Sequence, residues 1–499
     1  MRRSFGILAI ILIGAAVLRV IGLGAGIPYA IGVDEPQLVN RAVIMMKTGD
    51  FNPHFFDYPT LYIYLQVVVG VARFLTGAMA GRWAGLNQFS AADCYLWARA
   101  LTALFGTLTV ALVYRAARGW GDGPALLAAA LMAVMPLHVR ESHYALTDVP
   151  LTFFVTLTLL LSQRAHEDGR ARTFAYAGAA AGLAAAMKYP GALSLLMPLT
   201  AAALTPGAAG SRARAIGCAL SGAALAFVIA CPYVLLDLPD FLNGFGRLAG
   251  MYTPTGGPPA WLTYLKHLRN ALSWPASLAA VAGLVVACVE LTNSRTRVVA
   301  ALSLVFVAAF YALLARQSGI VFGRYVLPLT PFVCLFVASA AARIWTALRR
   351  AAGPQSRRAA ALVLAALLLV MPAATSAGFD RSLMKQSTQA LVYAWLARHA
   401  APTQLIVVEG ADLVLAYGPF RSETIRELRQ KTAQEYAAEG ATYLVASSAC
   451  YGPFLRDPGF NADAYVQYTR LFAATDEVAD IEPSDDHPGP EYRILKVRP

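Results

Sequence analysis

The chain has 499 residues, of which 58% are hydrophobic and only 14% are charged. A soluble globular protein of this length needs far fewer apolar residues, so the composition excludes that class and predicts a protein that lies mostly in lipid. The net charge of +12 does not indicate nucleic-acid binding, because the basic residues stand in short clusters between apolar runs, as in membrane loops. The six cysteines form no CxxC pair and several of them fall inside apolar runs, so neither a zinc site nor a disulfide framework is indicated.

Apolar runs long enough to cross about 30 Å of hydrocarbon as helices recur as far as residue 378. The expected transmembrane segments are residues 5–27, 99–117, 123–139, 149–163, 173–188, 191–206, 215–235, 275–291, 298–315, 325–345 and 359–378. These are about eleven spans. We interpret the first as an uncleaved anchor rather than a signal peptide, because of its length and because the membrane pattern continues after it.

The run at residues 61–80 is also long enough to cross, and it decides the topology because each added span inverts everything after it. With this run left out, the short loops on one side hold the basic clusters at residues 2–3, 115–118, 164–172, 212–214, 295–297 and 343–358. The short loops on the other side hold only Arg140, Lys188, Arg316 and Arg324. The positive-inside rule therefore predicts a cytoplasmic N-terminus and a helix at residues 61–80 that lies in the outer interface.

This topology places the long segments of the chain outside the cytoplasm. They are the loops at residues 28–97 and 232–274, with the short loop 138–148 between them, and everything after residue 378. The predicted fold is an α-helical polytopic membrane protein, residues 1–378, with juxtamembrane helices in its first outer loop, followed by a small extracytoplasmic α/β domain, residues 379–499. In that domain we expect strands at 404–408, 442–446 and 492–497 and helices at 386–399 and 423–438.

Two adjacent acids, Asp34 and Glu35, stand soon after the first span. Paired carboxylates at a membrane surface are candidates for acid–base chemistry. The structural alternative is a helix start, with Asp34 as N-cap and Pro36 at an early helical position.

Further candidates lie later in the first outer loop and in the second. His54 and Asp57 are residue types that bind a metal ion or a sugar hydroxyl, although a lone histidine among aromatic residues is more often simply packed. Asp148 precedes an apolar helix, so it is either an N-cap or a second acid facing the same outer cavity as Asp34. No cluster of residues forms a convincing set of metal ligands.

Two basic residues face the same side in the predicted topology. Lys188 lies in a tight turn between spans, where it either snorkels to the membrane surface or binds a phosphate. Arg324 opens a span on the same face, and its guanidinium has the forked donor geometry that phosphate prefers.

The order of these motifs resembles that of the GT-C glycosyltransferases, in particular the branch of protein O-mannosyltransferases and lipid A aminoarabinose transferases. The resemblance covers roughly residues 1–378 and rests on the acidic pair and on the motifs at residues 58–62, 142–150, 188–191 and 324–328. The family's usual Pro-Pro-Leu is Pro59-Thr60-Leu61 here, so we assign that segment no more than a structural role.

The resemblance implies an inverting transfer from a polyprenyl-phosphate sugar. By position, Asp34 falls on the family's catalytic acid with Glu35 as its neighbour, and Asp148 falls on the acidic position of the second outer loop. Lys188 and Arg324 fall on basic positions near the donor phosphate. Weaker candidates for substrate contacts are His54, Asp57, Tyr58, His143 and Tyr325. Some members of the family use a divalent metal, but nothing in the sequence requires a cofactor.

The sequence leaves alternatives open. A polytopic transporter or a flippase for lipid-linked sugars also has many spans, although transporters usually place ionisable residues at the midplane rather than at the ends of spans. A membrane scaffold whose C-terminal domain binds a partner is a third reading. For the enzyme, the sugar is a hexose or a pentose, and the acceptor is a glycan, a lipid or a protein.

Overall fold

The computed structural model describes residues 2–32, 34–252, 260–293, 296–317, 321–351, 353–459 and 461–498. Part of the predicted outer loop 232–274 and Arg295 of one predicted cytoplasmic cluster lie outside these residues. The chain divides into two compact units. The first consists of Met1–Val20, Leu38–Phe89 and Trp97–Gly378, and the second of Ile21–Gln37, Ser90–Leu96 and Phe379–Pro499. The second unit thus includes two stretches of the predicted first outer loop besides the C-terminal residues.

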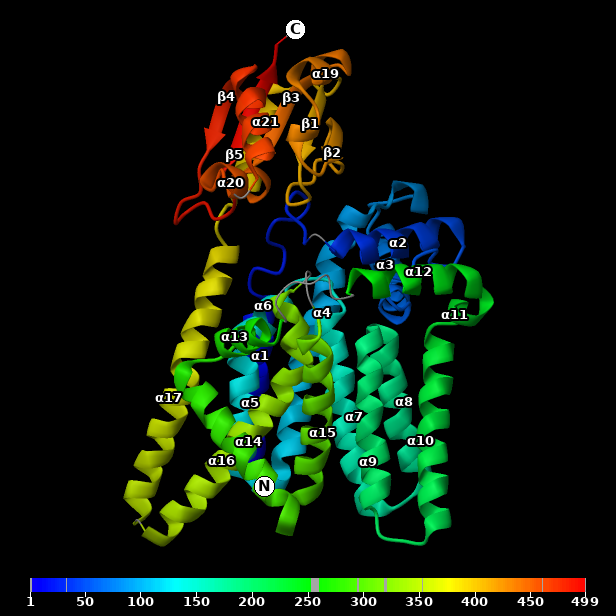
Figure 1. Ribbon diagram of the computed structural model, residues 1–499, viewed down its shortest axis with the longest axis vertical. Coiled ribbons are helices and arrows are strands. Elements are labelled where there is room, and N and C mark those ends of the chain that lie inside the picture. The colour runs from blue at the N-terminus through cyan, green and yellow to red at the C-terminus, as the bar shows by residue number, and fades with distance from the viewer. Residues whose placement is uncertain are drawn as a thin grey trace. The chain divides into compact units, whose positions relative to one another are not determined.

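The first unit is a helical bundle (Figure 1). Its α-helices, some of which continue into the second unit, are α1 (Arg2–Val20), α2 (Glu35–Thr48), α3 (Leu61–Met79), α4 (Tyr95–Ala117), α5 (Asp122–Val134), α6 (Pro136–Glu141), α7 (Asp148–Asp168), α8 (Ala171–Met187), α9 (Leu196–Leu204), α10 (Ala209–Ala230), α11 (Tyr233–Leu236), α12 (Leu238–Met251), α13 (Trp261–Asn270), α14 (Trp274–Asn293), α15 (Arg297–Ala315), α16 (Thr330–Ala351) and α17 (Pro354–Leu383). Short 3₁₀ segments are η1 (Leu86–Gln88), η2 (Ala91–Asp93), η3 (Arg118–Trp120), η4 (Tyr189–Leu195) and η5 (Gly323–Leu329).

The helices are those of a multi-pass membrane protein. Among the described residues, seven are long and apolar enough to cross a membrane: Leu61–Met79, Tyr95–Trp120, Ala209–Ala230, Trp274–Thr292, Arg297–Ala315, Gly323–Ala351 and Pro354–His399. Three of the predicted spans contain shorter apolar helices, Ser4–Val20, Asp122–Val134 and Tyr189–Leu204. The count of about eleven spans stays a prediction, as does the interfacial position of α3.

Several predicted spans differ in their bounds from the helices of the structure, and two of them show the physical reason. The first was expected over residues 5–27, but α1 ends at Val20, and Gly22 and Gly26 follow with φ angles of 77° and 73°. A positive φ does not continue a right-handed helix, so the glycines turn the chain away. The span expected over 123–139 divides into α5 and α6, because Pro136 begins a new helix.

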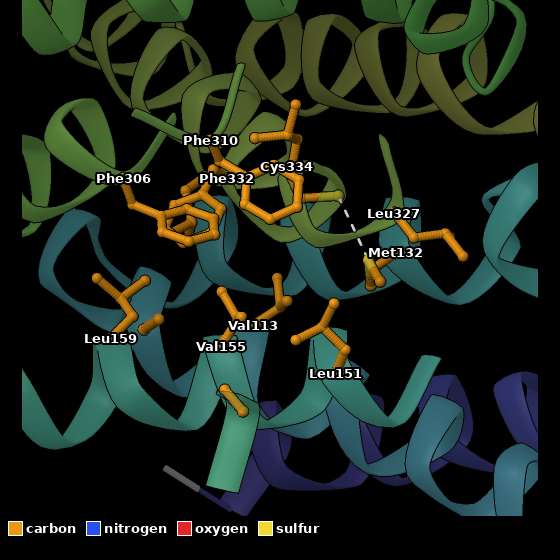
Figure 2. Close-up of a cluster of buried hydrophobic side chains, with 14 of the residues drawn as sticks. Val113, Met132, Leu151, Val155, Leu159, Phe306, Phe310, Leu327, Phe332 and Cys334 are labelled. Carbon is orange, nitrogen blue, oxygen red and sulfur yellow. Dashed lines mark hydrogen bonds between the residues drawn. The ribbon is translucent and has the colours of Figure 1, made fainter. Parts of the chain in front are cut away.

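The core of the bundle is built from side chains of several helices (Figure 2). Val155 and Leu159 of α7 lie in one cluster with Phe306 of α15 and Phe332 of α16, whose rings stack with centroids 4.9 Å apart. Cys334 of α16 reaches Met132 of α5 at 4.0 Å between the sulfur atoms, so this packing joins the middle of the chain to its later helices.

Helices α8 and α10 pack closely because small residues line their contact. A Cβ added to Gly178 would lie 2.0 Å from the carbonyl oxygen of Ala219, and one added to Gly182 would lie 2.2 Å from that of Ala223. Both helices therefore approach backbone to backbone, which is a common arrangement between membrane helices. Figure 1 shows α7, α8 and α10 running alongside one another, whereas α12 crosses near their ends.

The second unit contains a five-stranded sheet in the order β2-β1-β3-β5-β4. The strands are β1 (Leu405–Glu409), β2 (Arg421–Ile425), β3 (Ala441–Ser447), β4 (Thr475–Ile481) and β5 (Tyr492–Val497). Strand β1 pairs in parallel with β2 and β3, and β5 is antiparallel to β3 and β4. The helices are α18 (Thr388–His399), α19 (Ala433–Ala438), α20 (Ser448–Arg456) and α21 (Ala462–Ala473), with the 3₁₀ turn η6 (Leu428–Gln430).

The sheet buries both of its faces, since successive residues of β1 enter different clusters. Leu405 and Val407 belong to one hydrophobic cluster, and Ile406 and Val408 to the other. The prediction of one helix over residues 423–438 was wrong. Residues 421–425 pair with β1 as a strand, and the helix begins only at Ala433, after a capping box formed by Thr432 and Glu435.

Candidate functional site

Asp148 is the centre of a charged cluster in the first unit. One oxygen of its carboxylate accepts a hydrogen bond from Lys188 Nζ at 2.7 Å, and the other lies 3.7 Å from Arg324 Nε. Only 4% of the Asp148 side chain is exposed, against 16% for Lys188 and 19% for Arg324. The N-cap of α7 is Thr147, so Asp148 is not the N-cap. Its carboxylate holds two cations from distant parts of the chain.

The turn after α8 fixes the direction of Lys188. The helix ends at Met187, Lys188 is extended, and its carbonyl accepts a hydrogen bond from Gly191 N at 2.8 Å. A Cβ at Gly191 would lie 2.3 Å from the carbonyl oxygen of Ala184, so glycine is required for this turn. The Lys188 ammonium is largely buried against Asp148. It therefore does not extend freely to the membrane surface, which was the alternative that the sequence left open.

Aromatic rings surround the Lys188 ammonium. Its nitrogen lies 4.5 Å from the ring centroid of Tyr325 and 6.0 Å from that of Tyr58. The Tyr325 hydroxyl is 2.8 Å from the hydroxyl of Tyr252, which follows the last residue of α12. Cation–π attraction adds to the ion pair in such a site. Tyr58 and Tyr325, predicted as weaker candidates, are thus neighbours of Lys188.

A second ion pair lies next to this cluster. Arg140 donates two hydrogen bonds to Glu141 Oε1, at 2.9 Å from Nε and 2.6 Å from Nη2. Burial raises the pKa of Glu141, while Arg140 opposes the rise, and the charges of Asp148 and Arg324 also act on it. Glu141 was missed in the sequence because an acid beside an arginine in a short loop looks like an ordinary surface pair.

A buried arginine supports the segment that carries Glu141. The guanidinium of Arg19 donates to the carbonyls of Met132 at 3.2 Å and Ala133 at 3.0 Å, near the C-terminal end of α5, and lies 3.0 Å from His138 Nδ1. It therefore satisfies carbonyls that the break before Pro136 leaves without helical partners. The sequence did contain a signal for Arg19, because a charged side chain inside an apolar run is costly to bury and usually has polar partners.

Three other predicted residues lie in the first unit but make different contacts. Asp57 accepts a hydrogen bond from Arg247 at 2.6 Å. His54 is exposed and lies 3.0 Å from Asp50. His143 is buried, with its Nδ1 2.9 Å from the carbonyl of Val139.

Asp34 and Glu35 belong to the second unit. Glu35 is the first residue of α2, is fully buried, and accepts a hydrogen bond from Gly32 N at 2.6 Å. Asp34 forms the turn before it, where its carbonyl accepts a hydrogen bond from Gln37 N at 3.2 Å. The catalytic role of this pair stays a prediction.

Comparisons with known proteins agree with this architecture. Residues 94–235 match the family described as dolichyl-phosphate-mannose-protein mannosyltransferase. The oligosaccharyltransferase of Archaeoglobus fulgidus has a similar structure, with a TM-score of 0.60 at 12% identity over 95% of this chain and 73% of that one. ArnT from Cupriavidus metallidurans, solved with undecaprenyl phosphate, has a TM-score of 0.59 at 14% identity over 98% of this chain and 97% of that one. A search of the curated proteins finds no match.

These similarities confirm the resemblance inferred from the sequence. At such low identity, the solved structures establish the fold rather than the reaction. The matched family and both structures belong to one superfamily of membrane enzymes. The chain has the fold of the GT-C membrane glycosyltransferases.

Proposed function

We propose that this protein is an inverting glycosyltransferase that moves a sugar from a polyprenyl-phosphate donor to an acceptor on the extracytoplasmic side of the membrane. The observation that carries the proposal is the pair of cations, Lys188 and Arg324, held on the buried carboxylate of Asp148. Two cations fixed on one carboxylate form a preorganised site for an anion, because little side-chain freedom remains to be lost when the anion binds.

The charge balance of the cluster suits a leaving phosphate. Lys188 and Arg324 together exceed the charge of Asp148 by one positive unit, and Arg140 and Glu141 form a neighbouring pair of opposite charges. A donor phosphodiester carries one negative charge, and the lipid phosphomonoester that leaves carries close to two. Cations that contact this phosphate stabilise the transition state more than the ground state, which is the condition for faster chemistry.

The transfer itself needs a base. An acceptor hydroxyl loses its proton to a carboxylate, its oxygen forms a bond to the anomeric carbon, and the bond from that carbon to the phosphate oxygen breaks with its electrons on the phosphate. We assign the base to Asp34 with Glu35 as its neighbour, as the family resemblance implies. One displacement inverts the anomeric centre and needs no second carboxylate as nucleophile.

We assign Asp148 the role of positioning the two phosphate-binding cations. This assignment rests on its contacts, since one carboxylate oxygen accepts a hydrogen bond from Lys188 and the other lies near Arg324. Tyr325 extends this positioning, since its ring lies against Lys188 and its hydroxyl is tied to Tyr252.

The similar structures support a lipid phosphate as the leaving group. One structure of the Archaeoglobus fulgidus enzyme contains an inhibitory peptide and a dolichol-phosphate, and the ArnT structure contains undecaprenyl phosphate. We propose the same class of donor here. Whether the sugar is a hexose or a pentose, and whether the acceptor is a glycan, a lipid or a protein, is the next question for the purified enzyme.

Donor turnover tests the proposal. The full-length protein and its Asp34→Asn variant are incubated in detergent with a panel of polyprenyl-phosphate sugars, and the release of polyprenyl phosphate is followed by mass spectrometry. We expect release by the wild type and not by the folded variant. No release with any donor, together with movement of labelled lipid across a vesicle bilayer, would replace the transferase with a flippase.

A further inference from the structure

A second group of ionisable side chains lies in the first unit, apart from the Asp148 cluster. His54, Asp237 and Asp240 each present one ligand atom, and these three atoms all lie within 4.8 Å of one another. His54 comes from the loop between α2 and α3, whereas Asp237 and Asp240 come from the start of α12. The sequence separates the two segments by more than 180 positions, which is why no metal-ligand pattern was visible in it.

The contacts of Asp237 differ from those that a carboxylate at a helix start usually makes. Asp237 is the N-cap of α12, but its side chain makes no capping hydrogen bond and instead accepts one from Asn52 Nδ2 at 2.6 Å. Within the described parts of the chain, no lysine or arginine forms an ion pair with Asp237 or Asp240. Two neighbouring carboxylates thus lie near an imidazole, and among the described residues no lysine or arginine is paired with them.

The loop that carries His54 is held in place by its own hydrogen bonds. Asp50 accepts one from Asn52 N at 2.9 Å, and Asn52 accepts one from His54 N at 3.2 Å. The second oxygen of Asp50 lies 3.0 Å from His54 Nε2. A carboxylate on one nitrogen of a histidine fixes the ring and strengthens its other nitrogen as a metal ligand.

We propose that His54, Asp237 and Asp240 bind a divalent transition-metal ion of the Zn²⁺ type, with water completing the coordination. Zn²⁺ accepts both imidazole nitrogen and carboxylate oxygen as ligands, whereas Ca²⁺ and Mg²⁺ prefer oxygen ligands alone. Tetrahedral zinc places its ligand atoms about 3.3 Å apart. The side chain of Asp240 is exposed, so it can move toward that spacing when the ion binds.

The ion would link the loop between α2 and α3 to α12, because each of them supplies a ligand. The same loop carries Phe56, whose carbonyl accepts a hydrogen bond from Tyr189 at 2.9 Å, and Tyr58, which lies beside Lys188. Helix α12 runs from the site to Tyr252, the partner of Tyr325. The site is therefore structural rather than catalytic, and it does not depend on the proposed transfer reaction.

Metal binding tests the inference directly. The full-length protein, purified in detergent with an affinity tag free of histidine, is stripped with EDTA and titrated with Zn²⁺ against a fluorescent chelator. We expect one Zn²⁺ per chain, and at least 10-fold weaker binding in His54→Ala and in Asp240→Asn, since even the loss of a hydrogen-bond partner of a metal ligand weakens binding about 10- to 100-fold. Co²⁺ in place of Zn²⁺ is expected to give visible absorption bands that His54→Ala removes.

Matched controls are His487→Ala and Asp463→Asn, which remove the same residue types from the second unit. Both are expected to bind Zn²⁺ like the wild type. Thermal unfolding of every variant in EDTA checks that the metal-free fold is kept. The inference is overturned if the wild type takes up no Zn²⁺, if the two site variants bind as tightly as the wild type, or if Ca²⁺ displaces Zn²⁺ at equal concentration.

Discussion

The carboxylate of Asp148 and the ammonium of Lys188 lie 2.7 Å apart although 40 positions separate the two residues. One begins α7 and the other directly follows α8, so the packing of these two helices brings them together. Taking each charge out of water is costly, so a pair with so little exposure is stable only while both partners are present.

The first prediction concerns Lys188 as a ligand of the donor phosphate. Lys188→Ala removes one of the two cations that we expect to stabilise the leaving phosphate, and it should lower kcat/KM for donor turnover about 100-fold. Lys266→Ala is the matched control, because Lys266 is an exposed lysine of α13. Equal activity of the two variants would remove Lys188 from the phosphate site.

The second prediction concerns the energy of the Asp148–Lys188 pair. Removing either charge alone leaves the other one buried without its partner, so Asp148→Ala and Lys188→Ala should each lower the free energy of unfolding by about 3 kcal/mol. The double variant should lose less than the sum of the two. A double-mutant cycle from denaturant unfolding in detergent measures this coupling, and simple additivity would show that the pair contributes nothing.

The hydroxyl pair of Tyr252 and Tyr325 gives a third prediction. Tyr252→Phe removes the 2.8 Å hydrogen bond and keeps both rings, so the loss of stability should be about 1 kcal/mol. If Tyr325 positions Lys188, the variant should also lower kcat for donor turnover, because Lys188 is proposed to act mainly on the phosphate of the transition state. Tyr311→Phe, which loses a hydrogen bond to the carbonyl of Trp261 instead, controls for the loss of a hydroxyl as such.

The sequence predicted the parts of the molecule that depend on local pattern. Apolar length indicated the membrane helices, and helical or strand-length runs indicated β1, β3, β5 and α18. Strand β2 was missed because its residues Arg421–Ile425 are mostly exposed and become a strand only by pairing with β1. Such pairing is a tertiary effect that local propensity does not contain.

The candidate site likewise depends on tertiary contacts that the local sequence pattern does not contain. Asp148, Lys188 and Arg324 were chosen one by one, and the structure brings them together. Their neighbours Glu141 and Tyr252 were not chosen, because Glu141 beside Arg140 looks like an ordinary surface pair and Tyr252 contributes through Tyr325, which is distant in sequence. The cluster of His54 with Asp237 and Asp240 was invisible for the same reason.

The contact between α8 and α10 gives a fourth prediction. Gly178→Ala places a methyl group 2.0 Å from the carbonyl oxygen of Ala219, so the helices must separate, at a cost of about 1–3 kcal/mol in stability. Gly217→Ala is the matched control on α10, since a Cβ there meets nothing within 4 Å. Thermal unfolding in detergent should show a lower Tm for the first variant only. Equal Tm values would mean that the helices are not packed this closely.

The last prediction concerns pH and Glu409, at the end of β1. Its carboxylate accepts hydrogen bonds from Tyr468 at 2.6 Å, from Leu428 N at 2.7 Å and from Ser447 N at 3.0 Å. Burial nevertheless raises the pKa of Glu409 from 4.5 to about 7. The folded state therefore binds a proton more tightly than the unfolded state, so the stability of the domain should fall as pH rises from 4.5 to 7 and then level off.

Glu409→Gln should remove this dependence, because the amide resembles the protonated acid and does not ionise. Over the full range the wild type should lose on the order of 3 kcal/mol relative to the variant. Hydrogen exchange of the β1 and β3 amides, corrected for the intrinsic effect of pH, measures this locally. Glu482→Gln, which changes an exposed acid of the same domain, should keep the wild-type slope. If the stability of Glu409→Gln still fell between pH 4.5 and 7, the pH dependence would belong to another group. The carboxylate of Glu409 would then be ionised over this pH range, because its three hydrogen-bond donors outweigh its burial.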